Sequence, residues 1–304
     1  MRTALKRLAF HLPVVGRLLA DRDALYRGIG PYPPGHYHSP IPARDDVQRD
    51  AGRLWSVPRT LPGVDLRESA QLALLNEFAG YYKDLPFPEE PTPGYRYYLN
   101  NSLFAYADGI TLYCMMRHAR PHRVIEVGSG YSSAAMLDTS ERCFDNAVDL
   151  TLIEPDPRRL HTLIRPEDRD RIRFIERRVQ DVPPETFQIL RANDILFVDS
   201  SHVAKIGSDV NYLMAEVVPT LAPGVYVHFH DVPYPFEYFR QWVDAGIAWN
   251  EAYIVRAFLM FNRTYHIEFF NTFLEYFHRG WFEEHMPLCL RNTGGSLWLK
   301  RVGD

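Results

Sequence analysis

The sequence predicts an α/β protein built on a seven-stranded, mostly parallel sheet with helices on both faces. Two observations carry this prediction. Short apolar segments alternate with helical patterns from residue 123 onward, which is typical of a parallel sheet with crossover helices. In addition, the first apolar segment runs into a glycine turn and then a helix, as in nucleotide-binding α/β sheets.

The first strand is expected at 123–127, where the apolar run suits burial on both faces of a sheet. Gly128, Ser129 and Gly130 then turn the chain. Glycine suits such a turn because, without a Cβ, it takes positive φ and lets a ligand approach the backbone. The helix that follows has free N–H groups at its start, and these make an electropositive rim.

Glu126, just before the glycines, helps to distinguish a dinucleotide-binding site from a site for a positively charged cofactor. The full dinucleotide fingerprint needs a third glycine where Ser133 stands, and a carboxylate here repels a pyrophosphate but attracts a cation. The segment resembles motif I of class I S-adenosylmethionine (SAM) dependent methyltransferases, in which E-x-G-x-G holds the methionine end of the cofactor. The resemblance implies cofactor binding by Glu126, Gly128, Ser129 and Gly130.

The second and third strands are expected at 149–154 and 171–179. Glu154 ends the second strand 24 positions beyond Gly130, where a carboxylate of a nucleotide-binding sheet accepts hydrogen bonds from ribose hydroxyls. Gln180 and Asp181 follow the third strand, where this class of enzyme contacts adenine. A solvated polar loop is the alternative for that pair.

Ionisable residues end the fourth and fifth strands. Asp199 follows the apolar run that begins at 194, with His202 three residues on, and a helix at 208–221 leads to a fifth strand that ends in His230 and Asp231. Ligands bind beyond the carboxyl ends of parallel strands. The tips of strands one, four and five are therefore expected to converge on one site.

The pair D-x-x-H after the fourth strand narrows the resemblance. Residues 123–231 are similar to a Rossmann-like branch of class I methyltransferases that includes metal-dependent macrolide-sugar O-methyltransferases and cephalosporin hydroxylase-like proteins. Segments near 265–271 and 296–301 supply the usual sixth and seventh strands.

The resemblance also implies roles for the ionisable residues. In that branch, the aspartate matching Asp199 and an acidic pair after strand five hold a divalent cation, and the histidine matching His202 is the base. This chain has His230 and Asp231 in place of the acidic pair. Mixed nitrogen and oxygen ligands suit Mn(II), Fe(II) or Zn(II) better than Mg(II). Lys205 is the alternative base.

The expected function is methyl transfer from SAM to an oxygen of a small metabolite, such as a glycoside or a polyketide-like compound. Two other classes stay open. His202, His230 and an aspartate have the composition of an Fe(II) facial triad, so a non-haem iron oxygenase on a methyltransferase-like fold is one alternative. The other is a non-catalytic partner-binding protein that uses the aromatic stretch 258–282.

The composition fits one catalytic domain with an extension. At 304 residues and 46% hydrophobic content, we expect a Pro- and aromatic-rich extension and lid at 1–95 and the SAM-binding domain at 96–304. A net charge of −4 without a basic stripe argues against nucleic acid. The three widely spaced cysteines indicate neither a disulfide framework nor a zinc knuckle.

No membrane span is expected, because no apolar run approaches the ~20 residues that a spanning helix needs. Segment 1–20 mimics a signal sequence, but it lacks a cleavage site. We therefore expect a cytoplasmic protein, with a short amphipathic helix that touches a membrane or a partner as the alternative for this segment. The sequence leaves a homo-oligomer open.

Overall fold

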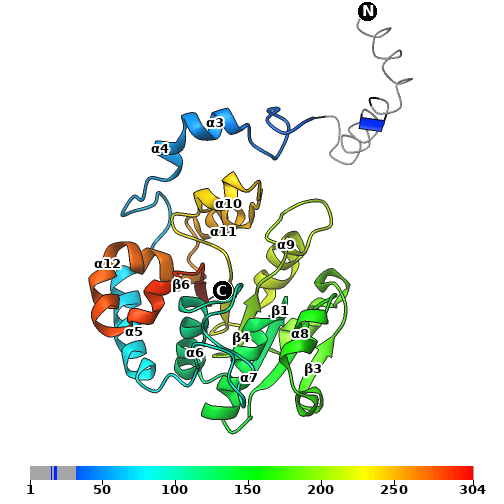
Figure 1. Cartoon of the computed structure of the whole chain (residues 1–304), viewed down its shortest axis with the longest axis vertical. Helices are drawn as coiled ribbons and strands as arrows, with labels where there is room; N and C mark the ends of the chain where they lie inside the picture. Colours follow the sequence, from blue (N-terminus) through cyan, green and yellow to red (C-terminus); the bar gives the residue numbers. More distant parts are fainter. Residues whose placement is uncertain (1–14, 16, 19–31, 304) are drawn as a thin grey trace, which may run out of the picture. The chain divides into compact units, whose positions relative to one another are not determined.

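The chain divides into two compact units, Met1–Ser56 and Val57–Asp304. The computed structural model describes residues 15, 17–18 and 32–303, so most of segment 1–20 lies outside the described residues, as do 30 and 31 of the Pro-rich stretch (Figure 1). The first unit contains the short helices α3 (Arg44–Arg49) and α4 (Ala51–Leu54), neither of which has a buried residue.

The expected boundary at residue 95 differs from this division. Helix α5 (Glu68–Tyr82) belongs to the second unit, because Leu74, Leu75 and Phe78 on it are buried in the core of that unit. The apolar face of α5 is therefore covered by the core of the second unit.

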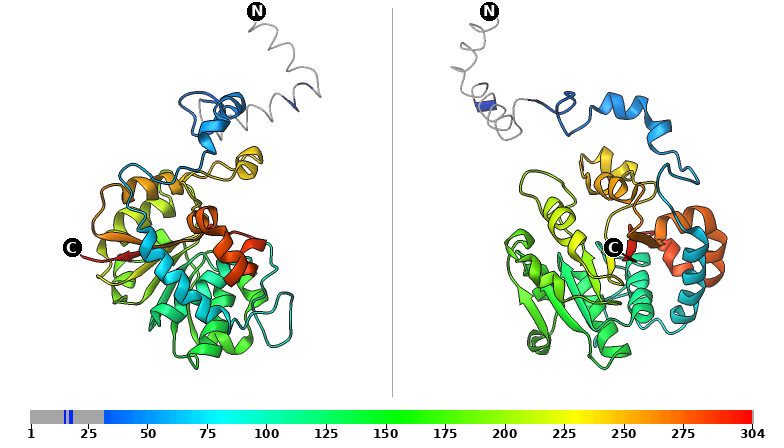
Figure 2. Two further views of the ribbon diagram at one scale, coloured as in Figure 1. Left: turned by 90° about the vertical axis from the view of Figure 1, so that its left-hand side faces the viewer. Right: turned by 180° about the vertical axis from the view of Figure 1, so that it is seen from behind.

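The second unit is built on a seven-stranded sheet in the order β3-β2-β1-β4-β5-β7-β6. Strands β1 to β5 are parallel, and β7 runs antiparallel to β5 and β6. Helices lie on either side of the sheet (Figure 2). The seven-stranded, mostly parallel fold is thus confirmed, with strands at β1 (Arg123–Val127), β2 (Asp149–Ile153), β3 (Ile172–Ile175), β4 (Ile195–Val198), β5 (Tyr226–Phe229), β6 (Tyr265–Phe270) and β7 (Leu297–Arg301).

Helices connect the strands as the alternating pattern predicted. The α-helices of the second unit after α5 are α6 (Ala107–Ala119), α7 (Tyr131–Cys143), α8 (Arg158–Leu163), α9 (Asp209–Tyr212), α10 (Arg240–Asp244), α11 (Glu251–Leu259) and α12 (Asn271–His285). The helix expected at 208–221 begins as α9 and continues as a π-helical turn and a 3-10 turn. Pro219 lies in the 3-10 turn, where it cannot donate an N–H to an α-helix.

The third strand is shorter than expected and ends at Ile175. Beyond it the chain leaves the sheet, and Gln180 and Asp181 lie in a separate 3-10 turn, Val179–Asp181. In the C-terminal aromatic stretch, Phe269, Phe270 and Phe273 are buried in the core, so they stabilise the sheet and are not available to a partner. In the described part of the chain, no helix has the length and apolar content to cross a membrane.

Arg96 fastens the segment before α6 to the core. Its guanidinium, 1% exposed, pairs with Asp138 at 2.7 Å, Asp168 at 2.5 Å and Glu141 at 2.8 Å. The backbone N–H groups of Arg96 and Tyr97 also donate to Asp138. A buried guanidinium with this many partners fixes the path of the chain towards α6.

Candidate active site

The glycine turn after β1 is packed against the loop that follows β4. Gly128 has φ +85°, and a Cβ on it would lie 1.7 Å from the carbonyl oxygen of Asp199. The Asp199 N–H donates to the Val127 carbonyl at 2.8 Å. Glycine is therefore required here for a close approach of two backbones, and this approach brings Asp199 beside the turn.

Glu126, just before the turn, is a buried residue. It is the penultimate residue of a central strand and is fully buried. The Ser132 hydroxyl donates to it at 2.6 Å, and the Ser133 hydroxyl also donates to it. Burial raises the pKa of Glu126 to about 8, although these serine hydrogen bonds oppose the shift. Glu126 thus ties β1 to the start of α7.

Glu154 lies beside the turn, at the end of β2. Its carboxylate accepts the Ser129 N–H at 3.1 Å and the Asp156 N–H at 2.7 Å. Each oxygen keeps a lone pair for a further donor. By contrast, the Gln180 amide donates to the Gly207 carbonyl, and Asp181 forms an exposed pair with Arg178.

The ends of β4 and β5 bring together the four predicted ionisable residues. His230 Nδ1 lies 3.2 Å from Asp199 Oδ1 and 3.7 Å from Asp231 Oδ2. His202 Nε2 lies 3.5 Å from the same Asp199 oxygen and 3.6 Å from Asp231 Oδ2. One ligand atom from each of Asp199, His202 and His230 falls within 4.8 Å of the others. The expected convergence of strands four and five is therefore confirmed.

The backbone conformation at the ends of β4 and β5 directs the side chains of His202, His230 and Asp231 towards one another. His230 N donates to the Val198 carbonyl at 2.9 Å, so the β4–β5 pairing continues one residue beyond the strand. His202 and Asp231 then take left-handed φ values of 59° and 54°. Such conformations cost free energy in residues with a Cβ and are found at functional sites, where the surroundings hold them.

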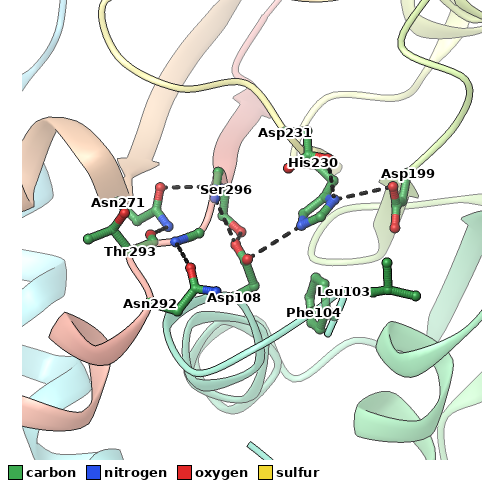
Figure 3. A network of polar contacts seen from close by, with 12 residues as sticks. Leu103, Phe104, Asp108, Asp199, His230, Asp231, Asn271, Asn292, Thr293 and Ser296 are labelled. Carbon is green, nitrogen blue, oxygen red and sulfur yellow. Dashed lines mark hydrogen bonds and ion pairs between the residues drawn. The ribbon is translucent and has the colours of Figure 1, made fainter. Parts of the chain in front are cut away.

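Two buried carboxylates that the sequence analysis missed complete the cluster. Asp108, in the first turn of α6, lies 3.4 Å from His230 Nε2 and accepts the Ser296 hydroxyl at 2.7 Å (Figure 3). Glu251, the first residue of α11, lies 2.9 Å from His202 Nδ1. Each histidine thus has one ring nitrogen against a buried carboxylate and the other towards Asp199 and Asp231.

Only a weak sequence signal marked these two residues. Asp108 is a carboxylate at the start of a helix that is otherwise largely apolar. Glu251 is an acidic residue in a first helical turn, where the helix dipole favours a carboxylate whether or not it has a role in a site. Both are far in sequence from the strands that they support.

The cluster favours positive charge. Burial disfavours ionisation of Asp199, but His230 and His202 hold its pKa well below the usual range. Burial alone would lower the pKa of His202, yet Asp199 and Glu251 raise it to about 10. The carboxylates of Asp231, Asp199 and Asp108 likewise outweigh burial and raise the pKa of His230. The surplus of carboxylates over imidazoles is a suitable environment for a cation.

His228 plays no part in the cluster. It shares a strand with His230, but it stacks on Phe197 with ring centroids 3.9 Å apart and bonds the Ser296 hydroxyl. Burial holds its pKa well below the ordinary value, so it is a neutral core residue.

A cavity of about 550 Å³ opens beside the cluster. Asp108 and Asp231 lie in its wall, and the ring of Trp249, another lining residue, is 4.5 Å from the His202 ring. The remaining lining residues are Phe239 and Trp242, with Ser102, Leu103, Arg240, Gln241, Asn292, Thr293 and Gly294. The volume suits a small organic molecule.

A Rossmann-like sheet with a glycine turn after β1 and an ionisable cluster at the ends of β4 and β5 defines a class I methyltransferase. Comparison with known proteins agrees. The methyltransferase-domain family Methyltransf_24 matches residues 125–232, which run from β1 to the end of β5. An uncharacterized protein of Archaeoglobus fulgidus is 34% identical over 188 residues, which cover 59% of this chain and 82% of that protein. Residues 125–232 of this chain therefore form a methyltransferase domain of this family.

Several solved structures are also similar to this chain. The O-methyltransferase TomG from Streptomyces achromogenes, in complex with SAM, is 16% identical, with a TM-score of 0.41 over 85% of this chain and 96% of that one. The Podospora anserina methyltransferase PaMTH1, bound to SAH, is 14% identical, with a TM-score of 0.40 over 85% and 95%. A structure described as CmcI-D160 with Mg and SAM is 19% identical, with a TM-score of 0.41 over 92% and 95%.

Proposed function

We propose that this enzyme transfers the methyl group of SAM to a hydroxyl oxygen of a small metabolite, with His202 as the general base. The observation that carries the proposal is the position of His202. Its Nε2 lies between Asp199 and Asp231, at the sheet edge where the glycine turn also ends, and its ring contacts the cavity wall at Trp249.

The residues around the turn fit the cofactor. The Glu154 carboxylate is fixed by two backbone amides and retains lone pairs for ribose hydroxyls. We propose that Gly128, Ser129 and Gly130 contact the methionine part and that Gln180 and Asp181 contact the adenine. When bound, SAM supplies an electrophilic methyl group on a sulfonium, so the protein mainly has to align the acceptor and remove its proton. Glu126 then supports the loop from below rather than contacting the cofactor.

We further propose a divalent-metal site formed by Asp199, His230 and Asp231. Asp199 Oδ1 lies 3.2 Å and Asp231 Oδ2 lies 3.7 Å from His230 Nδ1. This mixed nitrogen and oxygen set fits Mn(II), Fe(II) or Zn(II) better than Mg(II). A cation there would lower the pKa of an acceptor hydroxyl. It would also occupy the carboxylates that hold the second proton on His202, so the imidazole would become available as a base.

The acceptor belongs in the 550 Å³ cavity. The aromatic lining residues Phe239, Trp242 and Trp249 offer flat apolar faces, and Asp108 and Asp231 also line the cavity. Aromatic faces next to hydrogen-bonding groups suit a sugar ring or a planar polyketide-like ring with hydroxyl substituents. The lid role of the N-terminal extension, a cytoplasmic location and a homo-oligomer remain proposals from the sequence.

Calorimetric titration with SAM, with and without Mn(II), tests the cofactor assignment, and a methyl-transfer assay on hydroxylated sugars and phenols tests the reaction. Saturable SAM binding with methylation of an acceptor hydroxyl is expected. An Fe(II)- and oxygen-dependent oxidation without methyl transfer would instead support the alternative oxygenase, since Asp199, His202 and His230 also have the facial-triad composition.

A further inference from the structure

We infer that Glu251 is a positioning residue, which holds the Nδ1 side of His202 so that Nε2 faces the reacting hydroxyl. The inference rests on the proposed role of His202 as the base. It assigns a function to the first residue of α11, which no motif of the sequence marks.

The contact between the two side chains is short and shielded from solvent. Glu251 Oε2 lies 2.9 Å from His202 Nδ1, and the side chains are 1% and 6% exposed. The other oxygen, Oε1, has no hydrogen-bond partner among the described residues. His202 is thus the side chain to which Glu251 is bound, and a carboxylate is costly to bury for one contact unless that contact has a purpose.

The backbone around Glu251 holds the same histidine. The N–H groups of Asn250 and Glu251 both donate to the His202 carbonyl, at 3.0 and 3.2 Å. The Asn250 side chain accepts the Ala204 N–H at 2.6 Å and donates to the Ala204 carbonyl at 3.2 Å. Segment 249–251 therefore clamps both the backbone and the ring of His202, and it stabilises the left-handed φ of 59° at that residue.

The geometry leaves one orientation for the imidazole. With Nδ1 directed at Glu251, Nε2 points to Asp199 and Asp231, at 3.5 and 3.6 Å. A carboxylate on one ring nitrogen keeps a proton there, so that proton exchange with substrate is confined to the other nitrogen. Without Glu251, the ring can take the other tautomer or turn about its bond to Cβ.

The test uses the full-length protein with ¹⁵N-labelled histidine. The wild type should show a slowly exchanging, downfield Nδ1–H proton of His202, identified by its loss in His202→Gln. Glu251→Gln should remove or shift this signal, because an amide no longer selects a proton on Nδ1. Glu237→Gln is the matched control, since Glu237 is bonded to Tyr253 in the same region and not to His202.

Kinetics give the second readout. Glu251→Gln should lower kcat about tenfold to a hundredfold with little change in the KM for SAM, and Glu251→Asp should recover part of the loss. A Nδ1–H signal that is absent in the wild type or unchanged in Glu251→Gln overturns the inference, as does an altered signal with unchanged kcat. Because the NMR measurement needs no substrate, an enzyme that fails to methylate any acceptor contradicts the proposed function and not the Glu251–His202 contact.

Discussion

At the scale of single residues, the imidazole of His202 is buried and lies next to three carboxylates. It lies within 3.6 Å of the carboxylates of Asp199, Asp231 and Glu251. A base that removes the acceptor proton contributes to the chemical step but not to cofactor binding.

We therefore expect His202→Ala to lower kcat by about a hundredfold or more while SAM affinity stays nearly unchanged. Steady-state kinetics and calorimetry on the same preparation measure the two quantities. His285→Ala, at an exposed histidine on α12, is the control and should keep full activity. An unchanged rate in His202→Ala would move the role of base to Lys205 or to a metal-bound hydroxide.

Glu275 on α12 predicts a pH dependence of stability. Both of its oxygens lack a hydrogen-bond partner in the described part of the chain. Burial, with Asp108 nearby as a second cause and Arg279 in opposition, raises its pKa to about 9 from the ordinary 4.5. The folded protein thus binds a proton that the unfolded chain releases above pH 4.5, so stability from this group is complete below 4.5 and is lost as pH rises towards 9.

Glu275→Gln cannot ionise, so its free energy of unfolding should vary less with pH. Between pH 5 and pH 8 the wild type should lose stability relative to Glu275→Gln, on the order of 1 kcal/mol per pH unit. Urea unfolding of both proteins at several pH values measures this difference. Parallel curves for the two proteins would show that Glu275 is ionised in the fold.

The residues of the site differ in how far the sequence could predict them. Asp199, His202, His230 and Asp231 directly follow two strands, and the rule that strand ends carry the site was sufficient to find them. Asp108 and Glu251 could not be found in this way, because their roles depend on which helix packs against which loop. The full burial of Glu126 could not be predicted from the sequence, because it depends on how the helices cover both faces of β1.

At the scale of elements, the close approach of the β1 turn to the β4 loop controls the cofactor site. Any side chain at position 128 meets the Asp199 carbonyl and a φ of +85°. Gly128→Val should therefore abolish SAM binding, as measured by calorimetry. Gly246→Val is the control, because Gly246 has the same φ of +85° but has open space around it. Wild-type SAM affinity in Gly128→Val would show that this loop is not the cofactor site.

Arg96 links the segment before α6 to α7 through Asp138 and Glu141, and to the 3-10 turn Pro166–Asp170 through Asp168. Arg96→Met leaves Asp138 and Asp168 buried without their cation, and we expect a loss of about 3–5 kcal/mol in the free energy of unfolding. Denaturant unfolding measures it. Arg279→Met removes one partner of an exposed pair with Glu283 and should have little effect. Equal stability of the two variants would contradict an anchoring role for Arg96.

The elements themselves follow from periodicity, but their ends and partners do not. The strand and helix patterns located all seven strands, because apolar runs and turns are local properties. The end of β3 at Ile175 and the membership of α5 in the catalytic unit depend on packing between distant segments. No local sequence pattern in residues 57–95 indicates that their apolar side chains pack into the core of the second unit.

At the scale of the whole molecule, the strand order decides which residues can act together. Since β1, β4 and β5 are adjacent in the sheet, three strand ends separated by many residues in sequence meet at one edge. Helix α6, which precedes β1 in the sequence, adds Asp108, and helix α11, which follows β5, adds Glu251. Four carboxylates around two imidazoles leave negative charge that a divalent cation can neutralise.

This arrangement predicts that the purified enzyme retains a divalent metal and needs it. Elemental analysis of protein prepared without chelator should find Mn, Fe or Zn, and chelation should abolish methyl transfer until metal is restored. His230→Ala should weaken metal binding, because it removes the nitrogen ligand nearest Asp199, whereas His285→Ala should not. Magnesium should restore activity less well than manganese, since Mg(II) prefers oxygen ligands. Full activity in metal-free protein would instead mean that no cation is required and that His202 removes the acceptor proton without one.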